Sequence, residues 1–174
     1  MNKIISMNKK KNLTIKEIFA LAVKNHQENN LKVAENSYKE ILKINPNHTD
    51  AHNNLGVIFQ GLGENQKAKD CYEKAIEINP NYADVHFNLG LVFKELKEQE
   101  QSISCYQKTI QINPNYAGVY LNLGVVLGEL GEFKKAISCY EKAIKINPND
   151  VSAYNNLGVV FNQLGEYKKA ISFY

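Results

Sequence analysis

The stretch LNLGVVLGELGEFKKAISCYEKAIKINP, residues 121–148, is one copy of a pattern that runs through most of the chain. Each copy carries a Leu-Gly pair near its start and an Ile-Asn-Pro sequence at its end. The prolines set the period, because they recur every 34 residues: Pro46, Pro80, Pro114 and Pro148. A fixed period of this length is typical of proteins built from stacked repeats.

The apolar spacing within this stretch predicts two helices. Tyr120, Leu123 and Leu127 fall at positions i, i+3 and i+7 of one helical face. Gly131 can end this helix, because glycine adopts the left-handed conformation at little cost. A second apolar stripe predicts another helix, which must end before Pro148 because proline disfavours helical geometry in the residue before it.

A lone helix pair of this size cannot bury its apolar stripe, but a stack of such pairs can. A glycine inside a helix costs about 1 kcal/mol relative to alanine, so close packing must offset that cost. We predict that a glycine in each first helix lets its neighbour approach and that a tyrosine from each second helix fills the gap. The residues concerned are Gly56, Gly90, Gly124 and Gly158, with Tyr38, Tyr72, Tyr106, Tyr140 and Tyr174.

The spacing of Leu-Gly, Gly-Glu, Ala, Tyr, Ala and Pro in residues 121–148 resembles the tetratricopeptide repeat, and the resemblance covers residues 15–174. It implies an all-α, right-handed superhelical solenoid of antiparallel helix pairs, whose first helices line a concave groove that binds peptides or protein segments. About five repeats are expected. The expected parts are a basic disordered tail (1–13), a divergent first repeat (14–48), three full repeats (49–82, 83–116 and 117–150) and a truncated repeat (151–174).

Two local features add to this expectation. Thr14 and Glu17 have the spacing of a capping box, which would begin the first helix. The third repeat has Lys97, Ser102 and Thr109 where the other repeats mostly have glycine and alanine. We therefore expect its packing to be looser.

The charge distribution argues against nucleic-acid binding. The 21 basic residues are all lysine, against 18 acidic residues, so no guanidinium fork is present to bind guanine or phosphate. Four lysines within residues 1–11 account for the net charge of +3. No apolar run approaches the ~20 residues that span a bilayer, and no apolar signal segment opens the chain. We expect a cytoplasmic protein without a nucleic-acid or membrane partner.

No pattern of catalytic or metal-binding residues stands out. Cys71, Cys105 and Cys139 recur at the repeat period, on successive helices whose axes should lie about 8–10 Å apart, too far for a disulfide. His48 and His52 have the spacing of a helical metal site, but no third ligand completes it. We expect no cofactor, no metal and no catalytic residue.

The residue before each Leu-Gly pair is asparagine: Asn54, Asn88, Asn122 and Asn156. An amide both donates and accepts, so such a row can bind the backbone of an extended peptide. It resembles the asparagine ladder of O-linked N-acetylglucosamine transferases. Hydrogen bonding to the adjacent repeat and a bias of composition stay open as alternatives. The other predicted groove residues are Asn53, Phe87, Leu91, Lys94, Leu121, Val125, Asn155 and Val159.

These patterns predict a non-catalytic module that binds an extended peptide or protein segment. The inner positions lack the lysines and arginine with which chaperone adaptors of this family bind a C-terminal carboxylate, so chaperone tails are not expected. The opening repeat also resembles bacterial proteins whose repeats precede a glycosyltransferase or sulfotransferase domain. The alternative is therefore a substrate-docking arm of a larger transferase.

The last predicted helix, residues 168–174, is too short to cap a solenoid. It leaves the apolar faces of Leu157 and Phe161 without a partner in the sequence. We expect that the chain is part of a longer protein, or that it associates with itself through this end.

Overall fold

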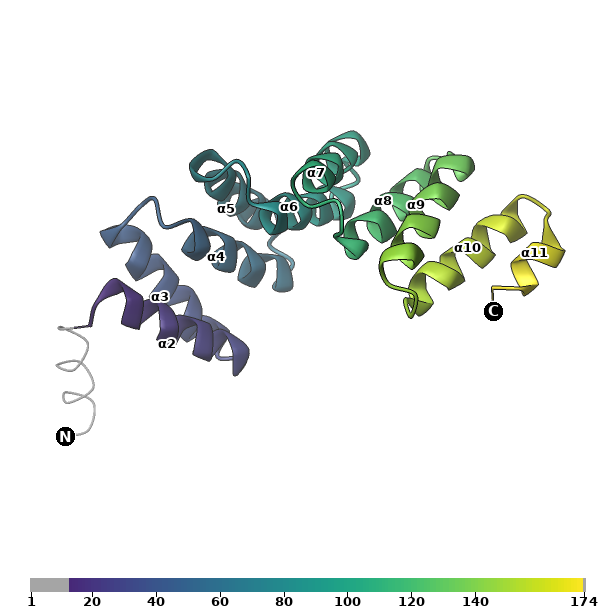
Figure 1. Cartoon of the computed structure of the whole chain (residues 1–174). Helices are drawn as coiled ribbons and strands as arrows, with labels where there is room; N and C mark the ends of the chain where they lie inside the picture. The colour runs from purple at the N-terminus through teal and green to yellow at the C-terminus, as the bar shows by residue number, and fades with distance from the viewer. Residues whose placement is uncertain (1–12, 174) are drawn as a thin grey trace. The chain divides into compact units, whose positions relative to one another are not determined.

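The computed structural model describes residues 13–173, and every regular element in that range is an α-helix (Figure 1). Most of the predicted basic tail, residues 1–12, lies outside the described residues. The helices are α2 (Ile15–Gln27), α3 (Leu31–Ile44), α4 (Thr49–Gly61), α5 (Asn65–Ile78), α6 (Ala83–Glu95), α7 (Gln99–Ile112), α8 (Ala117–Glu129), α9 (Phe133–Ile146), α10 (Val151–Gln163) and α11 (Tyr167–Ile171). The prediction of an all-helical chain is confirmed for this range.

The chain divides into two compact units, unit 1 (Met1–Pro80) and unit 2 (Asn81–Tyr174). In unit 1, α2 packs against α3 and α4 against α5, and α3 also contacts α4 (Figure 1). In unit 2, the pairs are α6 with α7, α8 with α9 and α10 with α11. Consecutive pairs contact each other through α7 and α8, and through α9 and α10. Within each unit, the structure therefore shows the predicted stacking of helix pairs.

The glycines inside the first helices are explained by the tyrosines beside them. A Cβ atom placed on Gly56 would lie 2.6 Å from Cε1 of Tyr72. The same construction on Gly124 gives 2.5 Å to Cε1 of Tyr140. Tyr72 is fully buried, so its ring has no free space to move into. The prediction that tyrosines fill the gaps left by these glycines is confirmed at both positions.

The turn between the two helices of a repeat uses a left-handed residue. Gly63, Gly131 and Gly165 have φ values of 73°, 75° and 76°. Asn29 and Lys97 occupy the same place in the first and third repeats with φ values of 60° and 63°. A lysine thus adopts a conformation that favours glycine, because the turn between α6 and α7 requires it.

The capping box at the start of α2 is confirmed. The Oγ1 atom of Thr14 accepts a hydrogen bond from the backbone N–H of Glu17 at 3.3 Å, and the Glu17 carboxylate accepts one from the Thr14 N–H at 2.8 Å. Removal of such a cap typically costs about 1 kcal/mol of stability. The N-terminus of α2, the first described helix, is therefore capped by side-chain hydrogen bonds.

The expectation of looser packing in the third repeat is wrong at the substituted helix positions. Ser102 and Thr109 are fully buried, as is Tyr106 between them. The Ser102 hydroxyl donates to the Gly90 carbonyl at 2.9 Å, and the Thr109 hydroxyl donates to the Cys105 carbonyl at 3.0 Å. Backbone carbonyls satisfy these hydroxyls, so Ser102 and Thr109 are as fully buried as the alanines at the same positions of the neighbouring repeats.

The last helix pair is the most exposed part of unit 2. The rings of Phe161 and Phe173 stack at 5.5 Å between centroids. Beside them, Tyr167 and Ile171 keep 63% and 73% of their surface exposed. Across the described residues, no helix has the length and apolar character needed to cross a membrane.

Candidate functional site

The candidate site lies on one surface of unit 2. We call the surface of α6, α8 and α10 that carries Asn88, Asn122 and Asn156 the first-helix face. Helix α8 contacts both α6 and α10, so this surface continues across three repeats. The predicted residues on it that are half-buried are Phe87, Asn88, Leu91, Lys94, Leu121, Asn122, Val125 and Asn156, and those that are exposed are Asn155 and Val159.

At the junction of α6 and α8, two predicted residues meet. The Nζ atom of Lys94 donates to Oδ1 of Asn122 at 2.8 Å. The Asn122 amide nitrogen donates to the Gly118 carbonyl, one turn earlier in α8, at 3.0 Å. The Asn122 amide is thus held by its own helix on one side and by a cation from the preceding repeat on the other.

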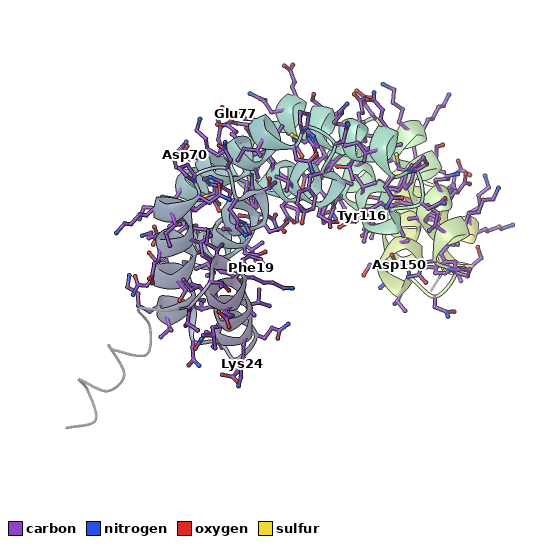
Figure 2. The ribbon with its side chains drawn as sticks, turned by 60° about the vertical axis from the view of Figure 1, so that its left-hand side comes forward. Phe19, Lys24, Asp70, Glu77, Tyr116 and Asp150 are labelled. Atoms are coloured by element: carbon purple, nitrogen blue, oxygen red, sulfur yellow. The ribbon has the colours of Figure 1, made fainter. Side chains whose placement is uncertain are left out.

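An aromatic pair lies on the same two helices. The ring of Phe87 on α6 lies 4.9 Å from that of Tyr116, the N-cap residue just before α8. Figure 2 labels Tyr116. Burial raises the pKa of Tyr116, and the nearby carboxylate of Asp84 adds to this shift. Tyr116 therefore stays a neutral phenol, and the pair adds aromatic surface to the first-helix face.

The two predicted site residues of unit 1 lie on α4 and are bonded within the protein. The Asn54 amide donates to the Tyr38 hydroxyl at 3.2 Å, and its oxygen accepts from the Asn53 amide at 3.2 Å. Asn53 is only 9% exposed, which leaves little of it to contact a ligand. Asn54 and Asn122 thus both form hydrogen bonds to the adjacent repeat, which was one of the alternatives to peptide binding for the asparagine row.

Between α8 and α10 the surface is hollowed. We call this depression the α8–α10 hollow. It is lined by Val125, Gly128, Glu129, Tyr140, Asn156, Val159, Val160 and Gln163. Three of these residues were predicted for the site, namely Val125, Asn156 and Val159.

Gly128 opens the hollow. In the two preceding repeats the equivalent positions hold Gln60 and Lys94, which have long side chains. A Cβ atom on Gly128 would find its nearest neighbour, the Tyr140 hydroxyl, 3.9 Å away. The glycine is thus not required by packing, and the missing side chain leaves room for a group from outside.

The prediction from sequence omitted Gly128, Tyr140 and Gln163. Gly128 carried a usable signal, because a residue without a side chain follows glutamine and lysine at the same place in the repeat. Tyr140 was assigned to packing alone. The structure places it in the core and at the edge of the hollow at once.

The histidines that resembled a metal pair have structural contacts. The Nδ1 atom of His48 accepts from the Ala51 N–H at 3.2 Å and caps α4, while its ring stacks on Phe19 at 4.9 Å. His52 bonds the Pro46 carbonyl through Nε2 at 2.8 Å. Within residues 13–173 no group of three or more histidine, cysteine, aspartate or glutamate side chains has the geometry of a metal site.

The three cysteines are half-buried free thiols. Burial raises the pKa of Cys71 and Cys139 to about 11, from an ordinary value of 9.0. Between about pH 9 and pH 11, these thiols therefore stay protonated in the folded protein, whereas they ionise in the unfolded chain. Since the unfolded chain then binds fewer protons, this contribution to stability is complete below about pH 9 and is lost as the pH rises toward 11.

We expect the melting temperature to fall between about pH 9 and pH 11, partly through these thiols. Replacing Cys71 and Cys139 together with alanine should flatten this fall. Tyr140 and Tyr106 have pKa values raised to about 12, mainly by burial, and contribute to the same fall in both proteins. Melting curves at several pH values test this, and an identical slope in the two proteins would contradict it.

Comparison with known families and structures agrees with this architecture. Family models described as tetratricopeptide repeat match residues 49–82 and 71–104, and one described as TPR repeat matches residues 92–131 and 127–165. The chain belongs to the tetratricopeptide repeat (TPR) family. Comparison of this TPR chain with curated protein sequences gave no match. Proteins with TPR folds generally mediate protein–protein interactions.

Several solved TPR structures resemble this TPR chain. A crystal structure of MamA is 28% identical, with a TM-score of 0.82 over 87% of this chain and 89% of that chain. PilF of Pseudomonas aeruginosa is 26% identical, with a TM-score of 0.83 over 91% of this chain and 72% of that chain. YrrB, described as a TPR protein with an unusual peptide-binding site, shares the fold at 22% identity, with a TM-score of 0.77 over 99% of this chain and 87% of that chain.

Proposed function

We propose that this chain is a non-catalytic interaction module that binds an extended segment of a partner protein on the first-helix face of unit 2. One side chain of that segment would occupy the α8–α10 hollow. The observation that carries the proposal is the hollow itself, which Gly128 lines at the position where earlier repeats carry Gln60 and Lys94. Protein binding is also the general role of the family, and YrrB is described as having a peptide-binding site.

The chemistry of the hollow suits a side chain that is apolar along its length. Val125, Val159 and Val160 provide an apolar lining, and Asn156 and Gln163 provide amides. Apolar pockets with a few polar groups that fix orientation are typical of ligand sites. The amides can donate to and accept from the backbone of an extended segment, which fixes its position without selecting its sequence.

Two further interpretations remain predictions. A transferase that carries these repeats as a docking arm is not favoured by any contact in the described residues. Self-association through the last helix pair would cover Tyr167 and Ile171, which are 63% and 73% exposed.

The proposal is tested by filling the hollow. In unit 1, the Tyr72 hydroxyl donates to Oε1 of Gln60 at 3.0 Å. Gly128→Gln places the same side chain at the same position in the fourth repeat, where it can accept from Tyr140 and occupy the hollow. A peptide selected on the native chain from a random displayed library, then synthesised, is the probe. We expect Gly128→Gln to weaken its binding at least about tenfold, which corresponds to about 1.4 kcal/mol.

The matched control is Ser138→Gln, which adds a side chain of the same kind to an exposed position of α9. This variant should bind the peptide with native affinity in the same calorimetric titration. Equal loss of binding in both variants, or none in Gly128→Gln, would reject the hollow as the site. A library from which no peptide emerges would reject the proposed function as a whole.

A further inference from the structure

Four polar side chains that line the α8–α10 hollow form no hydrogen bond or ion pair within residues 13–173. They are Glu129, Tyr140, Asn156 and Gln163. Tyr140 is only 3% exposed, and its hydroxyl lies nearest to a Cβ atom placed on Gly128, so the phenol is buried while its oxygen faces the hollow. Buried polar groups in folded proteins are nearly always hydrogen-bonded, so this set of groups indicates a place where a polar ligand binds.

Two residues explain why the Tyr140 hydroxyl has no partner in the described part of the chain. In unit 1, Tyr72 donates to Gln60 at 3.0 Å, whereas the fourth repeat has Gly128 at that position. In the third repeat, a serine four residues before the tyrosine bonds the phenol, whereas the fourth repeat has Ala136 there. The phenol of the fourth repeat is therefore available to a group from outside the chain.

Asn156 differs from two other asparagines of its row in the same way. Asn54 donates to the Tyr38 hydroxyl at 3.2 Å, and Asn122 accepts from Lys94 of the preceding repeat at 2.8 Å. The residue that stands at the place of Lys94 in the repeat before Asn156 is a glycine, which offers no donor from a side chain. The half-buried amide of Asn156 thus faces the hollow with both its donor and its acceptor available.

The hollow contains one charged group, and that group is negative. Glu129 is the charged residue among those that line it, and α8 and α10 contain no other charged residue. Burial raises the pKa of Tyr140 to about 12, and the nearby carboxylate of Glu129 adds a smaller shift in the same direction. Lys94 donates to Asn122, which does not line the hollow. The hollow therefore favours a cation and opposes an anion.

We infer that the α8–α10 hollow binds one basic side chain, arginine or lysine, of the partner segment. Its charged head would donate to the Glu129 carboxylate, to the Tyr140 oxygen and to the oxygens of the two amides. A guanidinium has five N–H donors and an ammonium three, so one basic head can reach several acceptors at once. Val125, Val159 and Val160 would contact the apolar stem, as apolar surfaces commonly cover the methylenes of basic side chains.

Other side chains suit the hollow less well. An apolar side chain would leave the four polar groups without partners, and an acidic one would meet the Glu129 carboxylate. The N–H groups of the two amides remain available for the backbone of the segment. The inference rests on the proposed function for the segment that supplies the basic side chain.

The test uses acetyl-Gly-Arg-Gly-amide and the same peptide with citrulline, which keeps the shape of arginine but carries no charge. Each peptide is titrated into the native chain at low ionic strength while NMR follows the methyl resonances of Val125 and Val159. We expect the arginine peptide to bind about threefold more tightly, since Glu129 is exposed and an exposed ion pair contributes modestly. The preference should shrink as salt is added, because salt screens exposed charges.

Three variants test the roles of the two protein groups. Glu129→Gln should abolish the preference for arginine, whereas Glu141→Gln, which removes the same charge from an exposed position of α9 outside the hollow, should retain it. Tyr140→Phe should bind the arginine peptide about threefold more weakly, because the head loses one acceptor. Its melting temperature should stay close to the native value, whereas Tyr72→Phe, which removes a hydroxyl bonded to Gln60, should melt lower.

Equal affinity of the two peptides for the native chain, valine resonances that do not move, or a preference that survives Glu129→Gln would overturn the inference. Its failure is distinguishable from failure of the proposed function. A library-selected peptide that loses affinity for Gly128→Gln but not for Glu129→Gln would keep the hollow as the binding site and reject a basic side chain as its occupant.

Discussion

Replacing Leu123 with alanine is expected to lower the free energy of unfolding by about 2–5 kcal/mol. Leu123 is 7% exposed and belongs to the core cluster of unit 2, which also contains Tyr106, Tyr140 and Val126. The substitution removes buried methyl groups and leaves a cavity that the surrounding helices can only partly close. The loss should therefore exceed that from transfer of the side chain to water alone.

Urea denaturation followed by circular dichroism measures this loss. Leu130→Ala is the matched control, since Leu130 lies at the end of the same helix and is 43% exposed. Its replacement should change the free energy of unfolding by about 0.5 kcal/mol or less. Similar costs for the two substitutions would mean that Leu123 does not hold the core together.

Replacing Gly124 with alanine should make the protein less stable by about 1–3 kcal/mol, although alanine is the better helix former by about 1 kcal/mol. The new Cβ atom would lie 2.5 Å from Cε1 and 2.8 Å from Cδ1 of Tyr140. Tyr140 is 3% exposed, so its ring cannot move away without disturbing the core. Overpacking should outweigh the gain in helix propensity.

Gly128→Ala provides the contrast within the same helix. Its Cβ atom would have no neighbour closer than 3.9 Å, so the propensity gain of up to about 1 kcal/mol should appear as added stability. Thermal melting of the two variants beside the native chain tests both expectations at once. If Gly124→Ala melts higher than Gly128→Ala, the close approach of Tyr140 does not constrain position 124.

The helices, the turns and the glycine–tyrosine contacts were predictable from the sequence. Each is a local or periodic property, and repetition makes its signal stronger. The left-handed turn at Gly131 recurs at Gly63 and Gly165, for example, and all three have positive φ values in the structure. The spacing of Gly124 and Tyr140 likewise recurs at Gly56 and Tyr72, so the close contact could be inferred before any coordinates.

The site was less predictable, because its contacts depend on which side chain reaches which partner. Asn54 and Asn122 occupy the same position of the repeat, yet one bonds a tyrosine and the other a lysine. Lys94 and Asn122 are 28 residues apart, and no periodic pattern specifies their contact. The third repeat shows the same limit, since buried hydroxyls of Ser102 and Thr109 found backbone acceptors that a substitution pattern does not reveal.

The residue at positions 60, 94 and 128 has a different relation to the fold from its neighbours. The glycines and tyrosines that carry the packing stay the same from repeat to repeat, whereas this position changes from glutamine to lysine to glycine. Its side chain makes a different contact in each repeat, since Gln60 accepts from the Tyr72 hydroxyl and Lys94 donates to Asn122, while the helix pairs stay the same. The side chain at this position can therefore change in one repeat at a time, which alters what the surface binds, while the stacked helix pairs keep their architecture.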